Sequence, residues 1–186
     1  MIRKVLIGVG IIILILGIFV VYLSLTTKSH SPSEVAQFKS DAIEVKVNYC
    51  RPYKKERLIF GTEKESALVP YGKKWRTGAN EATEIYLSKP VEIDGQLIAA
   101  GSYTLYTIPE ADQWTVVFNA RTGYWGASLM DDPFKEEFDV LRAPAEVSPL
   151  SASVEQFGIS LQQVDSTKIR MSFAWDMVQA SLNIKY

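Results

Sequence analysis

Residues 50–83 hold an unusual concentration of side chains that can bind a ligand. Three arginines, a tryptophan and an asparagine occur here without the clear period of 2 or 3.6 that marks a strand or a helix. Arginine donates paired hydrogen bonds to carboxylates and phosphates, and a long irregular stretch in a compact domain is often a binding loop. The candidate ligand-binding residues are Arg51, Arg57, Tyr71, Trp75, Arg76, Asn80 and Thr83.

A structural interpretation of the same stretch competes with the binding interpretation, and we favour it at this stage. The arginines would then pair with acids or bind loop carbonyl groups, and Trp75 would close one end of the domain. Gly78 and Asn80 would only serve a tight turn. The sequence leaves both interpretations open.

The sequence lacks the common signatures of catalysis. His30 is the one histidine and precedes the expected domain, so a Ser–His or Cys–His nucleophile is not expected. Cys50 is the one cysteine, and one Cys with one His does not suffice for a zinc site. We expect Cys50 to be a small buried apolar group. No phosphate-binding loop, dinucleotide fingerprint or G-x-S-x-G motif occurs. We therefore expect no metal and no cofactor. A carbohydrate-active enzyme with two acids from distant strands ranks third among the functions considered.

An apolar run from Val5 to Leu25 stands ahead of these residues. As a helix it would be about 32 Å long, against a hydrocarbon core of about 30 Å. A cleavable signal peptide is the alternative, but the run is long and no small-residue cleavage site follows it. We expect a retained transmembrane anchor at 5–25, with residues 1–4 as a cytoplasmic stub, because Arg3 and Lys4 favour the cytoplasmic side. The predicted location is the bacterial inner membrane, with the rest of the chain on the periplasmic side.

The remainder divides into a short linker at 26–40, rich in Ser, Thr, Lys and Pro, and an exported domain at 41–186. Two of the 20 basic residues precede the apolar run, so 18 basic residues face 21 acidic ones beyond it. A negative domain of this kind lacks the basic face that nucleic-acid binding requires.

Alternating apolar and polar residues predict β-strands throughout the domain. The period of 2 is clear in 43–49, 157–161, 169–175 and 178–186, with a turn expected at Asp176-Met177. Asp94-Gly95 is a typical two-residue hairpin turn, and 103–108 with 114–118 are apolar enough to be central strands. Only 132–138 is expected to form a short helix, with Asp132 as its N-cap. The predicted fold class is all-β, an antiparallel β-sandwich or jelly-roll-like domain behind one transmembrane helix.

The sequence resembles a bacterial family, the domain of unknown function 2911, over about residues 41–186. The resemblance is carried by the segments 49–52, 57–61, 68–83, 100–105, 108–109, 114–119, 125–126 and 139–142, with Trp75-Arg76-Thr77-Gly78-Ala79-Asn80 at the centre. It implies an exported β-rich domain and no assigned activity. The chain departs from the family pattern at Cys50, where a small hydroxyl residue is usual. It also departs in a longer insertion at 62–67, and in having a firm anchor.

The leading functional hypothesis is a non-catalytic, membrane-anchored envelope domain. It would bind a ligand or a protein near the membrane surface through residues 51–83. The alternative is an accessory subunit of an inner-membrane complex, with the single span packed against partner helices.

Overall fold

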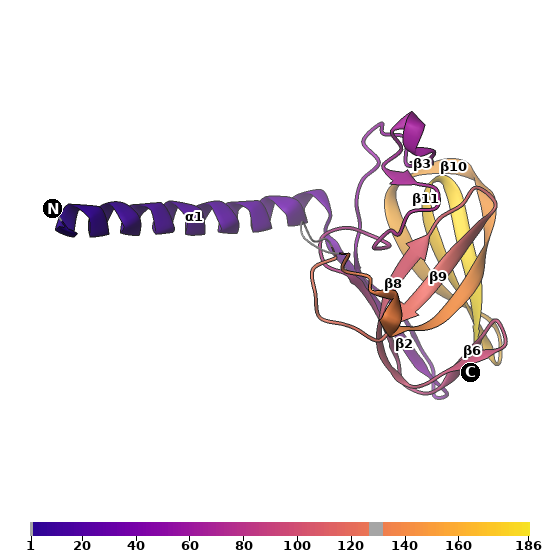
Figure 1. Cartoon of the computed structure of the whole chain (residues 1–186). Coiled ribbons are helices and arrows are strands. Elements are labelled where there is room, and N and C mark those ends of the chain that lie inside the picture. Colours follow the sequence, from indigo (N-terminus) through magenta and orange to yellow (C-terminus); the bar gives the residue numbers. More distant parts are fainter. Residues whose placement is uncertain (1, 127–131) are drawn as a thin grey trace.

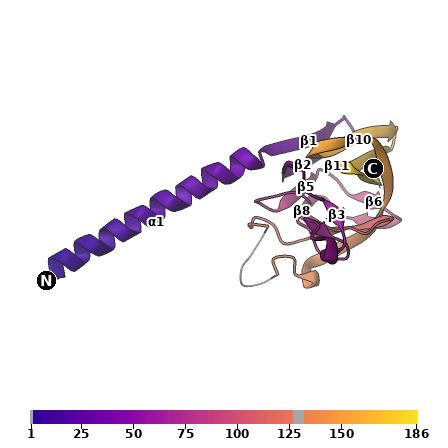
Figure 2. The same cartoon turned by 90° about the horizontal axis from the view of Figure 1, so that it is seen from above.

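The chain consists of one long helix followed by a β-rich domain in the computed structural model, which describes residues 2–126 and 132–186 (Figure 1). α1 (Ile2–His30) projects away from the domain in both views (Figures 1 and 2). Its segment 7–30 is long and apolar enough to cross a membrane, and the described part of the chain holds one such helix. A membrane anchor and a signal sequence both fit this description.

Nine strands form a single antiparallel sheet in the order β1-β2-β5-β8-β9-β10-β11-β6-β7. β3 and β4 form a separate small parallel pair. The strands are β1 (Ser33–Lys39), β2 (Glu44–Cys50), β3 (Phe60–Gly61), β4 (Val69–Pro70), β5 (Thr83–Leu87), β6 (Val91–Ile93), β7 (Gln96–Ile98), β8 (Gly101–Ile108), β9 (Gln113–Asn119), β10 (Asp139–Asp165) and β11 (Lys168–Lys185).

The sheet is strongly curved (Figure 1), and its long strand β10 pairs with different neighbours along its length. Its residues 139–146 pair with β9, and its residues 146–165 pair with β11. In Figure 1 the sheet bends round so that β8 and β9 lie on one side and β11 on the other. Side chains on the concave side form the core, including the fully buried Trp114, Phe118, Phe173 and Trp175.

Several strand predictions are confirmed. In β2, Val45 and Val47 are fully buried while Asn48 is exposed, as the alternation predicts. Asp94 and Gly95 connect β6 to β7, and both have positive φ (50° and 74°), as the favoured hairpin turn requires. Cys50 is also buried, as expected.

The predicted linker at 26–40 is mostly helix and strand in the structure. α1 continues to His30, and residues 33–39 form β1, which pairs with β2 along its whole length. β1 is an edge strand whose exposed side is mostly polar, so its sequence lacks the apolar alternation of a central strand. The helix is therefore joined to the sheet by two residues, Ser31 and Pro32.

The turn predicted at Asp176-Met177 is also absent, since β11 runs through it. Asp176 has a φ of 53° and marks a bulge, and β10 loses register opposite it between Pro149 and Gly158. The Asp176 carboxylate accepts hydrogen bonds from Lys54 Nζ (2.6 Å) and Ser153 Oγ (2.8 Å). The Asp therefore kinks a long strand and does not reverse the chain.

The helix predicted at 132–138 is reduced to a single 3₁₀ turn, η2 (Glu136–Phe138). A second 3₁₀ turn, η1 (Glu63–Glu65), lies elsewhere, between β3 and β4. The Asp132 carboxylate accepts a hydrogen bond from the Phe134 N–H (2.8 Å), which is local turn geometry. Phe134 is buried against Tyr106, and that packing holds the segment on the sheet without a helix.

Candidate functional site

A cavity of about 540 Å³ lies where α1 meets the domain. His30 and Ser31 come from the helix end, Lys55 and Arg57 from the loop after β2, and Arg76 from the loop after β4. The remaining lining residues are Pro52, Tyr53, Leu68, Val69, Trp75, Gly78, Ala79, Asn80 and Trp175. None of these fourteen described residues carries a carboxylate, so the charged groups of the cavity are cationic.

The floor of the cavity is aromatic and rigid. Trp75 stacks on Trp175 with ring centroids 5.8 Å apart and an interplanar angle of 18°, and it makes edge contacts with Phe60, Trp114 and Phe157. The Trp75 indole N–H donates to the carbonyl oxygen of Gly78 (3.2 Å), within the same loop. Trp75 is therefore fixed both by packing and by hydrogen bonding.

Arg76 is held between two anchored neighbours. The Trp75 N–H donates to the Thr107 carbonyl (2.7 Å), and the Thr77 hydroxyl, which is fully buried, bonds that of Thr107 (3.2 Å). The side-chain stem of Arg76 packs against Gly126, where an added Cβ would lie 3.0 Å from Arg76 Cδ. The backbone and the stem are thus positioned before any ligand arrives.

The guanidinium group of Arg76 has no hydrogen-bond or ion-pair partner among the residues that the structure describes. Burial lowers the pKa of this group below its ordinary value, although an arginine stays protonated in proteins. A partly desolvated charge without a partner is costly, and a ligand that supplies the missing acceptor removes that cost.

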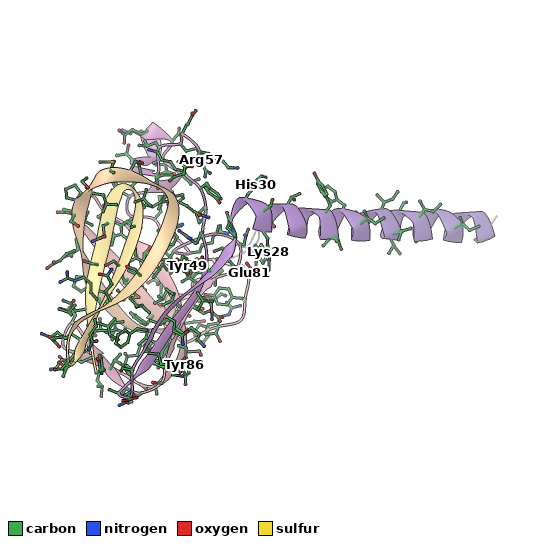
Figure 3. The ribbon with its side chains drawn as sticks, turned by 180° about the vertical axis from the view of Figure 1, so that it is seen from behind. Lys28, His30, Tyr49, Arg57, Glu81 and Tyr86 are labelled. Atoms are coloured by element: carbon green, nitrogen blue, oxygen red, sulfur yellow. The ribbon has the colours of Figure 1, made fainter. Side chains whose placement is uncertain are left out.

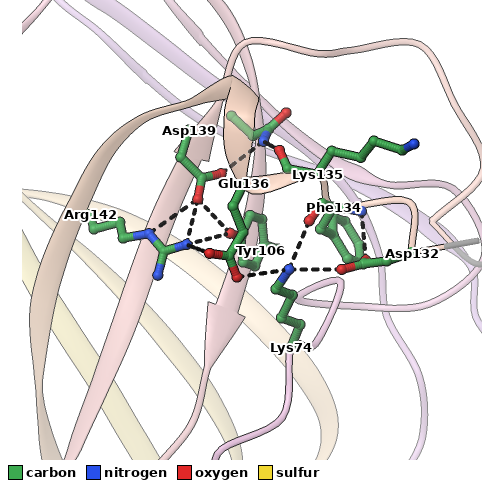
Figure 4. A network of polar contacts seen from close by, with 9 residues as sticks. Lys74, Tyr106, Asp132, Phe134, Lys135, Glu136, Asp139 and Arg142 are labelled. Atoms are coloured by element: carbon green, nitrogen blue, oxygen red, sulfur yellow. Dashed lines mark hydrogen bonds and ion pairs between the residues drawn. The ribbon is translucent and has the colours of Figure 1, made fainter.

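The carboxylate of Asp132, which shares a hollow with Arg76, is already paired with another cation. A shallower hollow next to the cavity also contacts Arg76 and contains Asp132. Figure 4 shows that Lys74 Nζ binds Asp132 (2.7 Å) and Glu136 (3.0 Å), while Arg142 binds Glu136 (3.1 Å) and Asp139 (2.7 Å). The hydrogen bond from Lys74 and its charge hold the pKa of Glu136 below its ordinary value. These acids therefore do not neutralise Arg76.

A family profile described as "Protein of unknown function (DUF2911)" matches residues 31–184, from before β1 to the next-to-last residue of β11. The chain belongs to this family. No curated protein and no solved structure matches this chain. The match includes β1, which agrees with the structural finding that residues 33–39 are part of the sheet.

Two more cations stand at the rim of the cavity in this DUF2911 domain. Arg57 donates through Nε to the Lys54 carbonyl (2.9 Å) and through Nη2 to the Tyr53 carbonyl. Lys55 Nζ lies 3.4 Å from His30 Nδ1 on the helix. Lys55 and Glu56 both have positive φ (49° and 60°), so a tight turn holds the rim in place. Figure 3 shows Arg57 on the side of the domain that faces α1, near His30.

Four of the seven predicted site residues line this cavity, namely Arg57, Trp75, Arg76 and Asn80. Asn80 binds carbonyl groups at the end of α1. Its amide donates to the carbonyls of Ser31 (3.3 Å) and Thr27 (3.5 Å). Beside it, Glu81 pairs with Lys28 (3.1 Å), so the 80–81 segment fixes the helix to the DUF2911 domain (Figure 3).

The other three predicted residues lie outside the cavity. Arg51 Nε donates to the Phe157 carbonyl (2.9 Å) and its Nη1 pairs with Glu34 (3.3 Å). Thr83 is fully buried and donates to the Thr77 carbonyl (2.8 Å). Tyr71 packs against the core at the small β3–β4 pair. Each of these three residues thus has contacts within the domain, and a ligand-binding role for them stays a prediction.

His30, Lys55 and Trp175 line the cavity but were not predicted as site residues. Lys55 lies within the stretch that the sequence singled out. His30 lies in the predicted linker and Trp175 in a predicted strand, and they meet only because residues far apart in the sequence come together in the fold. Within residues 2–126 and 132–186, no three His, Cys, Asp or Glu side chains gather to hold a metal ion.

We expect Arg51→Ala to lower the free energy of unfolding by about 1–3 kcal/mol, because it leaves the Phe157 carbonyl without its charged donor. The measurement is chemical denaturation of the full chain in an uncharged detergent. Arg170→Ala, at an exposed position of β11, is the control and should be near neutral. Equal stabilities for the two variants would contradict the structural role of Arg51.

Proposed function

We propose that this protein is a non-catalytic, membrane-anchored envelope domain, folded as a β-sandwich, that binds an anionic ligand close to the membrane surface. α1 would be the retained anchor in the inner membrane, and the DUF2911 domain would lie on the periplasmic side. The ligand would enter the cavity between the helix end and the domain, with its negative group on Arg76.

The unpaired guanidinium of Arg76 carries this proposal. Surface arginines usually lie in water, where a missing partner costs little. Arg76 is partly buried in a cavity that Lys55 and Arg57 also line and whose described lining has no carboxylate. Charge complementarity therefore favours an anion, and arginine geometry favours a carboxylate or phosphate with two acceptor oxygens.

Arg76→Gln separates a binding role from a structural one. We expect the variant to bind inorganic pyrophosphate at least about tenfold more weakly than the natural chain, since a charged hydrogen bond contributes about 1.5–3 kcal/mol. Its stability should be unchanged or higher, because the substitution removes a desolvated charge without a partner. Isothermal titration calorimetry and thermal unfolding of the full chain measure the two effects.

Arg170→Gln is the matched control, since it removes the same charge from an exposed position and should leave pyrophosphate binding unchanged. A loss of stability above about 1 kcal/mol in Arg76→Gln would make Arg76 a structural residue. Equal pyrophosphate affinity of the natural chain and Arg76→Gln would also reject the site.

A further inference from the structure

The cavity lies at the depth of the lipid headgroups if α1 spans the membrane. The apolar run ends at Leu25, and His30 on the cavity wall is five residues further along the same helix. Five helical residues rise about 7.5 Å, and the headgroup layer on each side of the hydrocarbon core is about 5–8 Å thick. The helix wall of the cavity thus stands at the outer part of that layer.

The helix and domain are fixed to each other at this depth. Asn80 bonds two carbonyls near the helix end, Lys28 pairs with Glu81, and Lys55 meets His30. The connection between α1 and β1 is only two residues long. The cavity therefore cannot move far from the bilayer surface while α1 is inserted.

The chemistry of the cavity matches an amphipathic anion. Its charged groups are cationic, its floor is Trp75 on Trp175, and Leu68 at its wall is 43% exposed. Leu58, whose carbonyl accepts from the Leu68 N–H (3.0 Å), is a second exposed leucine (46%). A phosphate on Arg76 would leave the glycerol and the first acyl carbons beside Leu68, which lines the cavity together with Arg76.

We propose that the ligand is the phosphate group of an anionic phospholipid in the leaflet where α1 ends. This inference rests on the proposed function, and it adds the ligand class and the route of entry from the membrane. The protein would then hold one lipid against the end of its own anchor, with Arg76 as the phosphate-binding residue and Lys55 and Arg57 at the rim.

Native mass spectrometry of the full chain in an uncharged detergent tests this. The probes are short-chain phosphatidylglycerol, short-chain phosphatidylcholine and glycerol phosphate. We expect one phosphatidylglycerol to be retained at least about tenfold more tightly than either other probe. Arg76→Gln should abolish the preference, Lys55→Gln should weaken it, and Arg170→Gln should leave it intact.

The other outcomes overturn different parts of the proposal. Glycerol phosphate binding as tightly as phosphatidylglycerol, with both dependent on Arg76, would reject the lipid and keep a soluble anion as the ligand. Equal retention of the two lipids in the natural chain and Arg76→Gln would reject the lipid site. Failure of every anion, pyrophosphate included, would reject the proposed function itself.

Discussion

Replacing Trp175 by Ala should lower the free energy of unfolding by about 3–5 kcal/mol, among the largest single-residue effects in this domain. Trp175 is 1% exposed and lies against Trp75, Phe60 and Phe157, with ring centroids 5.8–6.2 Å apart. Truncation removes these contacts and leaves a hole that the neighbouring rings cannot fill, because close-packed cores relax only partially. Its indole N–H also donates to the Glu155 carbonyl (3.3 Å), which would lose its donor.

Circular dichroism during chemical denaturation measures this effect without relying on tryptophan emission. Trp125→Ala is the matched control: Trp125 is 47% exposed, and we expect a change within about 0.5 kcal/mol. A loss below about 1 kcal/mol for Trp175→Ala would show that the aromatic cluster is not a close-packed part of the core.

The alternation of apolar and polar residues predicted the central strands well. It failed where a strand is polar or irregular. β2, β8 and β9 bury apolar side chains as the sequence indicates. β1 was not predicted as a strand because an edge strand needs few buried apolar residues. One of its apolar side chains, Val35, is 51% exposed. The turn predicted at Asp176-Met177 does not form because Asp176 adopts its positive φ inside β11, where it kinks the strand.

The candidate site was predictable in part because eleven of its fourteen lining residues, including the four predicted ones, lie in the irregular stretch 50–83. The sequence alone cannot tell a paired arginine from an unpaired one, since the partners come from distant strands. Arg51 pairs with Glu34 and donates to the Phe157 carbonyl, while the Arg76 guanidinium has no partner in the described part of the chain. The contribution of the helix end was missed for the same reason: Asn80 is 49 residues from Ser31, whose carbonyl it binds.

Gly78→Ala is the second substitution with a large expected effect. Gly78 has a φ of 153°, and a Cβ built on it would lie 2.8 Å from the Cys50 carbonyl oxygen and 3.2 Å from Thr83 Oγ1. The first of these neighbours is backbone and cannot rotate away. Strain at the unusual φ and the clash together should cost about 2–5 kcal/mol of unfolding free energy.

Comparison with Gly95→Ala shows how much of the loss of unfolding free energy in Gly78→Ala is due to the clash. Gly95 also has a positive φ (74°), but a Cβ there would meet nothing within 4 Å, so only the backbone penalty of about 1–2 kcal/mol applies. Gly78→Ala should therefore be the less stable variant in chemical denaturation of the full chain. It should also weaken pyrophosphate binding, because Gly78 lines the cavity and its carbonyl holds the Trp75 indole. Equal losses in the two variants would mean that the Gly78 loop can move away from Cys50, and the cavity wall would then not be rigid at this point.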